Sequence, residues 1–191
     1  MNRTSGISQT FFWLALAALM FCVAPQAHAQ SISRFEVGAD YNYVRSNAPP
    51  GGCTCFSLNG GDASFAVHFD PAFAAVAEIS SVHAGNISGS GADLTITSYL
   101  FGPRYHWHNH TKFTPFAEVL LGGAHAGTSL AGVGSSANAF AAKVGGGVDY
   151  ELTRRFSLRP FEANYYLTHF DNGVNDHQNN LQLGAGLVFH F

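Results

Sequence analysis

Ten histidines give this chain many side chains that could bind a metal or move a proton. The densest group is the segment HWHNH, in which His106, His108 and His110 occupy alternate positions. Alternate residues of a strand share one face, so these imidazoles could bind zinc or copper. No carboxylate or cysteine lies near them in the sequence, and we interpret them as polar residues at a water-exposed rim. We therefore predict neither a metal site nor a cofactor.

Two of the three cysteines, Cys53 and Cys55, are separated by one residue in the segment GGCTCFS. A disulfide between them would close a very small ring and would be strained. Metal binding is disfavoured, because no other ligand cluster accompanies the pair. We treat the pair as a candidate disulfide that stiffens a loop, with free or partner-linked thiols as the alternatives.

The amino end predicts an exported protein. Arg3 is followed by the apolar stretch FFWLALAALMFCVAP and then by AHAQ, which match the basic, apolar and cleavage regions of a signal peptide. We place the cleavage after Ala29, so that residues 1–29 are removed and residues 30–191 form one domain. The apolar stretch is shorter than the ~20 residues that a membrane helix needs, which disfavours a retained anchor.

The composition excludes some partners and suggests others. The chain has 9 Lys and Arg against 12 Asp and Glu, and this balance offers no basic patch for a nucleic acid. Charged residues make up 11% of the chain, whereas a soluble protein has about 25%. Much of the surface is therefore expected to face something other than water.

Beyond the amino end, apolar and polar residues alternate with the two-residue period of β-strands. The segment RFEVGADYNYVR shows this period, and NNLQLGAGLVFHF keeps it up to the last residue, Phe191. In FSLRPFEANYYLTHF the period changes phase between Arg159 and Glu162, and Pro160 suits a bulge there. Eight such segments occur, which predicts eight strands.

The connections between these segments alternate in length. Those after the first, third, fifth and seventh segments are the longer SNAPPGGCTCFSLNGG, HAGNISGSGAD, HAGTSLAGVGSS and DNGVNDHQ. Those after the second, fourth and sixth are the shorter DPA, HNHTK and ELTRR. This predicts an antiparallel meander with its long loops at one end, and its short turns and both termini at the other.

The polar face of these strands carries charges among glycines, while the apolar face is rich in Phe, Tyr, Leu and Val. This distribution suits a barrel with its apolar face toward lipid, in which the sheet must close so that every backbone group is paired. We therefore predict an all-β fold, an eight-stranded antiparallel up-and-down transmembrane β-barrel whose interior is filled by side chains.

Charges inside such a barrel must pair, because an unpaired buried charge costs several kcal/mol as an order of magnitude. We predict a lumenal charge network that contains Glu36, Asp40, Glu78, Arg104, Glu118, Lys143 and Glu162. Within it, Arg104, Lys143 and Arg159 should meet the glutamates Glu36, Glu78, Glu118 and Glu162. Asp149 and Arg159 lie near short turns, where water is an equally good alternative. His68 and His190 fall on the same inner face and should join the network.

A barrel closes only if its last strand pairs with its first, which explains a strand that continues to the final residue. Here the sequence resembles small outer-membrane β-barrel proteins of Gram-negative bacteria, akin to the OmpA amino-terminal domain and OmpX. The resemblance is carried by FSLNGGDASFAVHF, SYLFGPRYHW, TPFAEVLLGGAHA and GGGVDYELTRRFSLRPFEANYYLTHF. It implies an outer-membrane location and contact with membrane lipid and lipopolysaccharide. It also implies an assembly signal read by the barrel-assembly machinery, for which the matching residues are Leu183, Leu187, Phe189 and Phe191.

The group has no shared catalytic motif, so we expect no enzyme. The predicted role is structural or surface interaction by a monomer: membrane integrity, adhesion, or contact with an extracellular ligand through the long loops, and at most a narrow gated conduit. One alternative is a lipid-modifying enzyme that resembles a lipid A deacylase, with His125 beside Thr128 and Ser129 in AHAGTS. Another is a soluble periplasmic barrel that binds a small hydrophobic ligand.

Overall fold

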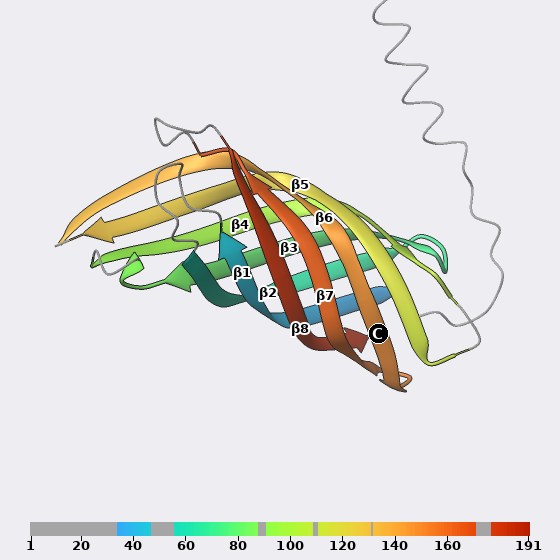
Figure 1. Ribbon diagram of the computed structural model, residues 1–191. Coiled ribbons are helices and arrows are strands. Elements are labelled where there is room, and N and C mark those ends of the chain that lie inside the picture. Colours follow the sequence, from blue (N-terminus) through green and yellow to red (C-terminus); the bar gives the residue numbers. More distant parts are fainter. Residues whose placement is uncertain (1–33, 47–55, 88–90, 109–110, 131, 171–176) are drawn as a thin grey trace, which may run out of the picture. The chain divides into compact units, whose positions relative to one another are not determined.

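The computed structural model describes residues 34–46, 56–87, 91–108, 111–130, 132–170 and 177–191. Within them, eight antiparallel strands form a closed barrel in which each strand pairs with the next and β8 pairs with β1 (Figure 1). The predicted fold class and number of strands are confirmed. The strands are β1 (Phe35–Ser46), β2 (Phe56–His68), β3 (Phe73–Ala84), β4 (Ala92–His106), β5 (Phe113–Leu130), β6 (Val133–Thr153), β7 (Phe156–Thr168) and β8 (Gln178–His190).

Some of the predictions fall outside this part of the chain. They are the signal peptide over residues 1–29, the candidate disulfide between Cys53 and Cys55, and His110. Among the residues that the structure describes, no helix has the length and apolar character needed to cross a membrane.

The final residue takes part in closing the barrel. The backbone N–H of Phe35 donates to the carbonyl of Phe191 at 3.1 Å, and the N–H of Phe191 donates back at 3.0 Å. The two rings also pack together, with centroids 5.8 Å apart. The alternation that continues to the carboxyl end therefore serves the β1–β8 seam.

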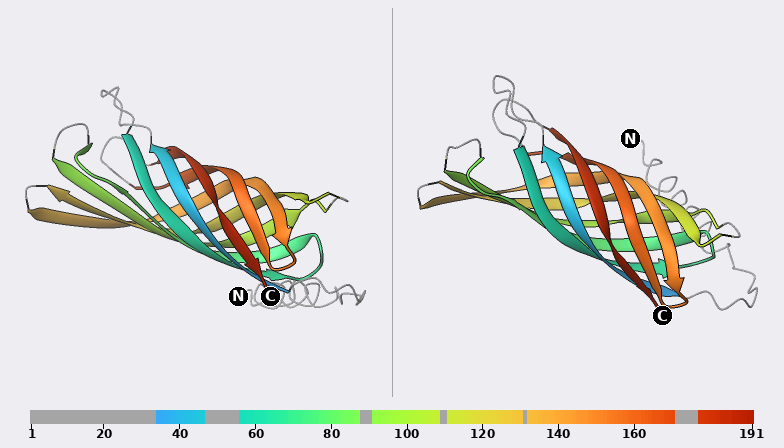
Figure 2. Two further views of the ribbon diagram at one scale, coloured as in Figure 1. Left: turned by 90° about the horizontal axis from the view of Figure 1, so that it is seen from below. Right: turned by 60° about the horizontal axis from the view of Figure 1, so that its bottom comes forward.

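The two ends of the barrel differ in their connections. Short connections join β2 to β3, β4 to β5 and β6 to β7 at the end where Phe35 and Phe191 meet, which we call the turn end. The opposite end, which we call the loop end, carries the other four connections. Figure 2 shows the tilted strands running between the two ends.

One predicted loop is wrong. The segment HAGTSLAGVGSS was expected to connect two strands, but β5 continues to Leu130, β6 begins at Val133, and these two residues face each other. Small side chains on both strands let the ladder continue, and Gly132 has the positive φ of 84° that a tight reversal requires. Similarly, β2 begins at Phe56, so FSLNGG is strand rather than loop.

The change of phase in the seventh segment is confirmed. The pairing of β7 with β8 shifts register between Arg159 and Glu162, and that of β6 with β7 shifts between Val148 and Tyr150. The irregularity lets Arg159 and Glu162, whose positions differ in parity, both lie on the inner face of the barrel, where both are buried.

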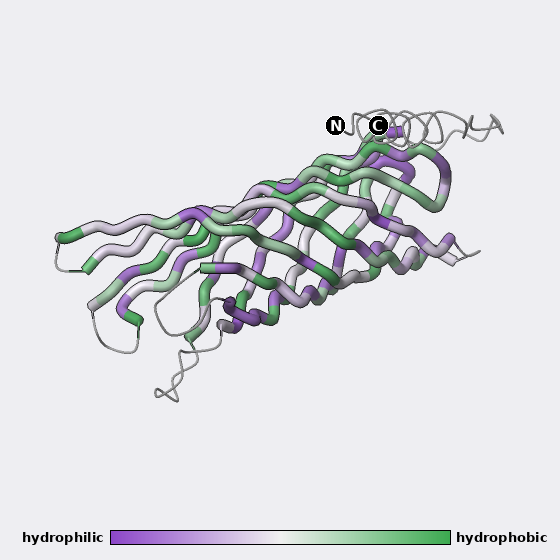
Figure 3. Tube along the Cα trace, turned by 90° about the horizontal axis from the view of Figure 1, so that it is seen from above, coloured by the Kyte–Doolittle hydropathy of each residue, from purple (hydrophilic) through white to green (hydrophobic). Residues whose placement is uncertain are grey.

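The barrel is inverted relative to a soluble one. Large apolar side chains cover the outside, with Phe101 62% and Phe161 53% exposed, while charged side chains such as Lys143 are fully buried. Hydrophobic and hydrophilic residues are accordingly interspersed along the strands in Figure 3. This arrangement is that of a barrel surrounded by lipid.

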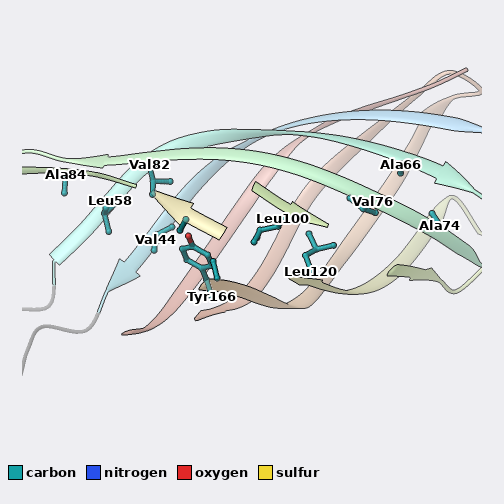
Figure 4. Packing of buried hydrophobic residues seen from close by; sticks show 12 residues of the cluster. Val44, Leu58, Ala66, Ala74, Val76, Val82, Ala84, Leu100, Leu120 and Tyr166 are labelled. Carbon is teal, nitrogen blue, oxygen red and sulfur yellow. The ribbon is translucent and has the colours of Figure 1, made fainter. Parts of the chain in front are cut away.

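A set of buried apolar side chains lines the interior along its length, and Figure 4 shows Ala66, Ala74 and Val76 towards the turn end. Towards the loop end this apolar cluster includes Val44, Leu58 and Val82, and Tyr166 reaches into the same cluster from β7. Leu100 and Leu120 lie nearer the middle of the barrel. Below them, towards the turn end, most of the buried charged side chains are found.

Candidate functional site

The lumenal site is built from charged residues at the inward-facing positions of several strands. Lys143 on β6 and Glu78 on β3 form an ion pair with 2.5 Å between Nζ and Oε1. The strands β3 and β6 are not neighbours in the barrel, so this pair crosses the lumen. Both side chains are almost fully buried, and the contact therefore obstructs the middle of the barrel.

Arg159 is the centre of the largest ionic cluster. Its Nε donates to Asp149 Oδ1 at 2.8 Å and its Nη2 donates to Asp149 Oδ2 at 3.1 Å, which is the bidentate geometry that arginine and carboxylate favour. Its Nη1 donates to Asp40 Oδ2 at 3.2 Å and to Glu162 Oε2 at 3.1 Å. Arg159 thus joins carboxylates from β6, β1 and β7. Asp149 and Arg159, for which a water-exposed position was an alternative, both lie in the buried cluster.

A second arginine stands close to this cluster. Nε and Nη2 of Arg104 approach Glu118 Oε2 at 2.8 and 2.7 Å, between the neighbouring strands β4 and β5. The ring of Phe116 interacts with both guanidinium groups, its centroid lying 4.7 Å from Cζ of Arg104 and 4.4 Å from Cζ of Arg159. Cation–π contact of this kind is strengthened where water is excluded.

Sequence reasoning missed Phe116. The residue has the same parity as Glu118 on β5, which was the available signal, but aromatic residues were assigned to the lipid-facing side. The structure places the ring inside the barrel, 3% exposed.

The prediction that Glu36 meets arginine or lysine is wrong. Its Oε1 instead lies 2.8 Å from His68 Nε2 and 3.1 Å from His190 Nδ1. Glu36 is near the beginning of β1 and pairs in register with Ala66 and His190, which places it near the turn end and beside the histidines. His68 and His190 therefore do face the lumen.

The interpretation of HWHNH as a water-exposed rim is wrong for His106. Its ring is 3% exposed and its centroid lies 5.1 Å from that of His68. The β-ladder continues through His106, whose N–H donates to the carbonyl of Ala72, so its side chain stays on the inner face. His108, two residues further on, is exposed. Within the described ranges no group of three histidine, cysteine or acidic residues is placed to hold a metal ion.

Neutral polar side chains complete the network, and the sequence did not single them out. Asn42 donates to Asp62 at 2.5 Å, and Asn164 donates to Glu162 at 2.5 Å. Near the loop end, the hydroxyls of Ser80 and Ser98 share a hydrogen bond of 2.6 Å. All of these residues have the inward parity of their strands, which was the signal that could have found them.

The residues of the enzyme alternative are not brought together. His125 faces outward, and its Nδ1 lies 2.7 Å from Oδ1 of Asn138 on β6. Thr128 is three residues away on the same strand and so points to the opposite face. Ser129 shares the face of His125 but stands about 13 Å further along the strand. The geometry of a histidine that activates a hydroxyl is therefore not present among these three side chains.

The four residues matched to the assembly signal lie on the outward face of the last strand. Leu187 and Phe191 are 53% and 54% exposed. The ring of Phe189 packs 4.9 Å from that of Phe156 and 5.7 Å from that of Phe191. Leu183 is partly exposed on the same face. Together they form an apolar stripe beside the β1–β8 seam.

An eight-stranded closed barrel with an apolar outside and paired charges inside defines a small integral β-barrel protein of the outer-membrane type. The sequence agrees with this class, since residues 14–189 match the family model described as the outer membrane protein beta-barrel domain. The chain belongs to that family.

Solved structures show the same fold. The Neisserial surface protein A is 17% identical over 85% of this chain and 100% of that chain, with a TM-score of 0.67. The attachment invasion locus protein Ail of Yersinia pestis is 17% identical over 81% and 98%, with a TM-score of 0.51. OprG from Pseudomonas aeruginosa is 11% identical over 82% and 95%, with a TM-score of 0.51. A search of curated protein sequences finds no match.

Proposed function

We propose that the protein is a monomeric outer-membrane anchor that presents its loop end to a partner outside the cell, and that its barrel is not an open pore. The observation that carries this proposal is the hairpin formed by β5 and β6. On the β7 side, the strand pairing of β6 begins at Ala141, opposite Thr168, and the carbonyl of Phe140 still accepts from the N–H of His169, so Val133–Ala139 extends beyond β7 (Figure 2). A strand extension of this length exceeds what is needed to close the barrel.

The filled interior supports the same proposal. Charged pairs in the middle and an apolar cluster towards the loop end leave the barrel better suited to hold a rigid surface than to pass solutes. The proposal includes the export route. The signal peptide is cleaved after Ala29, and the barrel is assembled through the apolar stripe of β8. It is inserted into the outer membrane of a Gram-negative bacterium, where it contacts phospholipid and lipopolysaccharide.

The chemistry of the extension indicates the kind of contact. In the β6 part of the extension, Gly134–Ala139 carries small and uncharged side chains, such as Ser135, Ser136 and Asn138, and they are largely exposed. They favour hydrogen-bonded contact with a polar, uncharged ligand. Ail has been solved in complex with the heparin analogue sucrose octasulfate. Among the described residues at the loop end, Arg45 is the single lysine or arginine, and its guanidinium already donates to Ser57 at 3.0 Å. A polyanionic ligand is therefore less well supported than a neutral polar one.

The experiment is an attachment assay with a shortened hairpin. A Gram-negative host that displays the full chain is applied to surfaces coated with extracellular matrix and to cultured epithelial cells. In the test variant, residues 127–136 are replaced by Asn-Gly, which joins the paired residues Ala126 and Ala137 by a two-residue turn. The control variant is Lys112→Ala, in the exposed turn at the opposite end.

We expect attachment above the empty-vector level for the wild type and for Lys112→Ala, and its loss for the shortened hairpin. All three proteins should show the same heat-modifiable gel mobility, which reports an intact barrel. Equal attachment by the shortened hairpin, or no attachment by the wild type, would contradict the proposed surface role.

A further inference from the structure

A groove of about 550 Å³ crosses the outward face of β1–β4. Its walls are the large side chains Phe65, Ile79, Tyr99 and Phe101, and its floor includes Ala63 and Ala77. The cross-strand register explains its shape. Phe65, Ala77 and Phe101 lie side by side in one row across β2, β3 and β4, and Ala63, Ile79 and Tyr99 lie in the next. Ala77 is thus flanked by two phenylalanines, and Ala63 by Ile79 on one side and Ala39 on the other, which leaves a depression where the alanines stand.

The groove lies at the depth of the membrane hydrocarbon. Towards the turn end, Phe73 and Tyr105 pack edge to face with centroids 4.8 Å apart, as in the aromatic girdle of a membrane barrel. Towards the loop end, the hydroxyls of Ser81 and Thr97 approach within 3.3 Å on the outward face and mark the start of a polar surface. Between these two rows the outward side chains of the groove are apolar.

We propose that this groove is a binding site for the acyl chain of a bilayer lipid. A flexible hydrocarbon chain can lie in a shallow apolar depression and gains dispersion contacts with its walls as well as its floor, which a flat wall does not offer. In a membrane, such packing is the main source of affinity, because apolar surface is not being removed from water.

The size of the groove favours a lipid over a second copy of the barrel. Ten residues line it, whereas a stable protein–protein interface uses about 20–30 residues on each side. The proposal needs only that the barrel stands in a bilayer, so it is independent of the surface role proposed above.

Fluorescence quenching by brominated lipid tests the site. Both native tryptophans are first replaced, by Trp13→Phe and Trp107→Phe. A single reporter is then introduced in the groove as Tyr99→Trp. The matched control is Phe140→Trp, which lies in the same cross-strand row two strands away, through Gly123, and outside the groove. The full chain is expressed, purified from the membrane fraction and reconstituted into dilauroyl phosphatidylcholine that contains increasing fractions of dibromostearoyl phosphatidylcholine.

We expect the groove reporter to show a relative binding constant for the longer brominated chain at least about twofold above that of the control reporter, because the groove offers extra van der Waals contact. Ala77→Phe fills the floor and should reduce the groove value to that of the control. Ala142→Phe adds the same ring in the same row on the far side, through Leu121, and should leave the groove value unchanged.

Equal binding constants for the two reporters would overturn the proposal, since the groove would then be ordinary barrel surface. Absence of quenching at Tyr99→Trp with normal quenching at Phe140→Trp would also overturn it, because a protein surface would then cover the groove. Each variant is accepted only if it keeps the heat-modifiable mobility of the wild type.

Discussion

The ammonium group of Lys143 reaches across the barrel to the carboxylate of Glu78, with 2.5 Å between Nζ and Oε1. Because β6 and β3 share no ladder, this contact braces two walls that backbone hydrogen bonds do not connect. The brace also places a fully buried cation where a pore would need free space. Stability and closure of the lumen therefore depend on the same pair.

Removal of one partner of this pair should be costly. Lys143→Met leaves Glu78 as an unpaired carboxylate inside the barrel, and we expect the free energy of unfolding to fall by about 3–5 kcal/mol. The double variant Glu78→Leu with Lys143→Met should recover most of this loss, because two apolar side chains need no partner. The measurement is urea unfolding of the protein in lipid vesicles.

Lys112→Met is the control for that series, since Lys112 is exposed in a turn. It should change the free energy of unfolding by no more than about 0.5 kcal/mol. A cost for Lys143→Met no larger than for the control would show that the pair does not brace the barrel.

The contribution of Arg159 to the stability of the barrel is expected to depend on the shape of its side chain as well as on its charge. A lysine at this position cannot make the forked contact with Asp149 and also reach Asp40 and Glu162. Arg159→Lys should therefore destabilise the barrel by about 1.5–3 kcal/mol, the value typical of lost hydrogen bonds to charged groups. The readout is the temperature at which heat-modifiable mobility is lost. The matched variant Arg155→Lys, at an exposed turn, should leave that temperature unchanged, and equal shifts for the two would contradict the prediction.

The fold was predictable from the sequence because it depends on parity. Lipid on one side and a charged lumen on the other give every strand the same two-residue signal, and the change of phase at Pro160 marks the irregular strand as well. The loop-end part of the β5–β6 hairpin was not predictable in the same way. Around Thr128 and Ser135 both faces meet water, so no alternation distinguishes strand from loop.

For the lumenal site, the sequence predicted which residues face the interior better than it predicted which residues form ion pairs with each other. Inward parity identifies Glu36 and Arg104 as lumenal, but which partner each meets depends on strand stagger around a closed barrel, and the sequence does not specify stagger. Glu36 is set beside two histidines for this reason. The inward ring of Phe116 was missed because its apolar character matched the outer face. The two arginines that contact the ring, together with the ring of His106, account for its position.

Two groups of buried side chains are expected to block ion passage, one after the other along the lumen; we call each group a seal. Phe116 and the two arginines obstruct the half nearer the turn end, while Leu120 and Tyr166, 0% and 3% exposed, belong to the apolar cluster beyond them. In planar bilayers we expect no steady ion conductance from the wild type or from Phe116→Ala, because the second seal remains in the single variant. Conduction should require removal of the pair that crosses the lumen as well, so the variant Phe116→Ala, Leu120→Ala and Tyr166→Ala combined with Glu78→Ala and Lys143→Ala should conduct.

The control for conductance is Phe161→Ala, which removes an aromatic ring from the outward face, where Phe161 is 53% exposed. This variant should show no steady ion conductance. Steady conductance by the wild type, or by Phe116→Ala alone, would show that the lumen is not closed in the way the buried side chains indicate.

The last residue should matter more for assembly in cells than for intrinsic stability. Phe191→Ser keeps the two backbone hydrogen bonds to Phe35 but removes the ring that packs on Phe35 and Phe189. If β8 is the segment that the assembly machinery reads, this variant should reach the outer membrane several-fold less than Phe140→Ser, which removes an outward ring of similar exposure from β6. The comparison is the amount of heat-modifiable protein in the membrane fraction. When the purified chains are folded into detergent without the machinery, the two variants should give similar yields, and an equal deficit of Phe191→Ser in detergent would instead assign the ring to barrel closure alone.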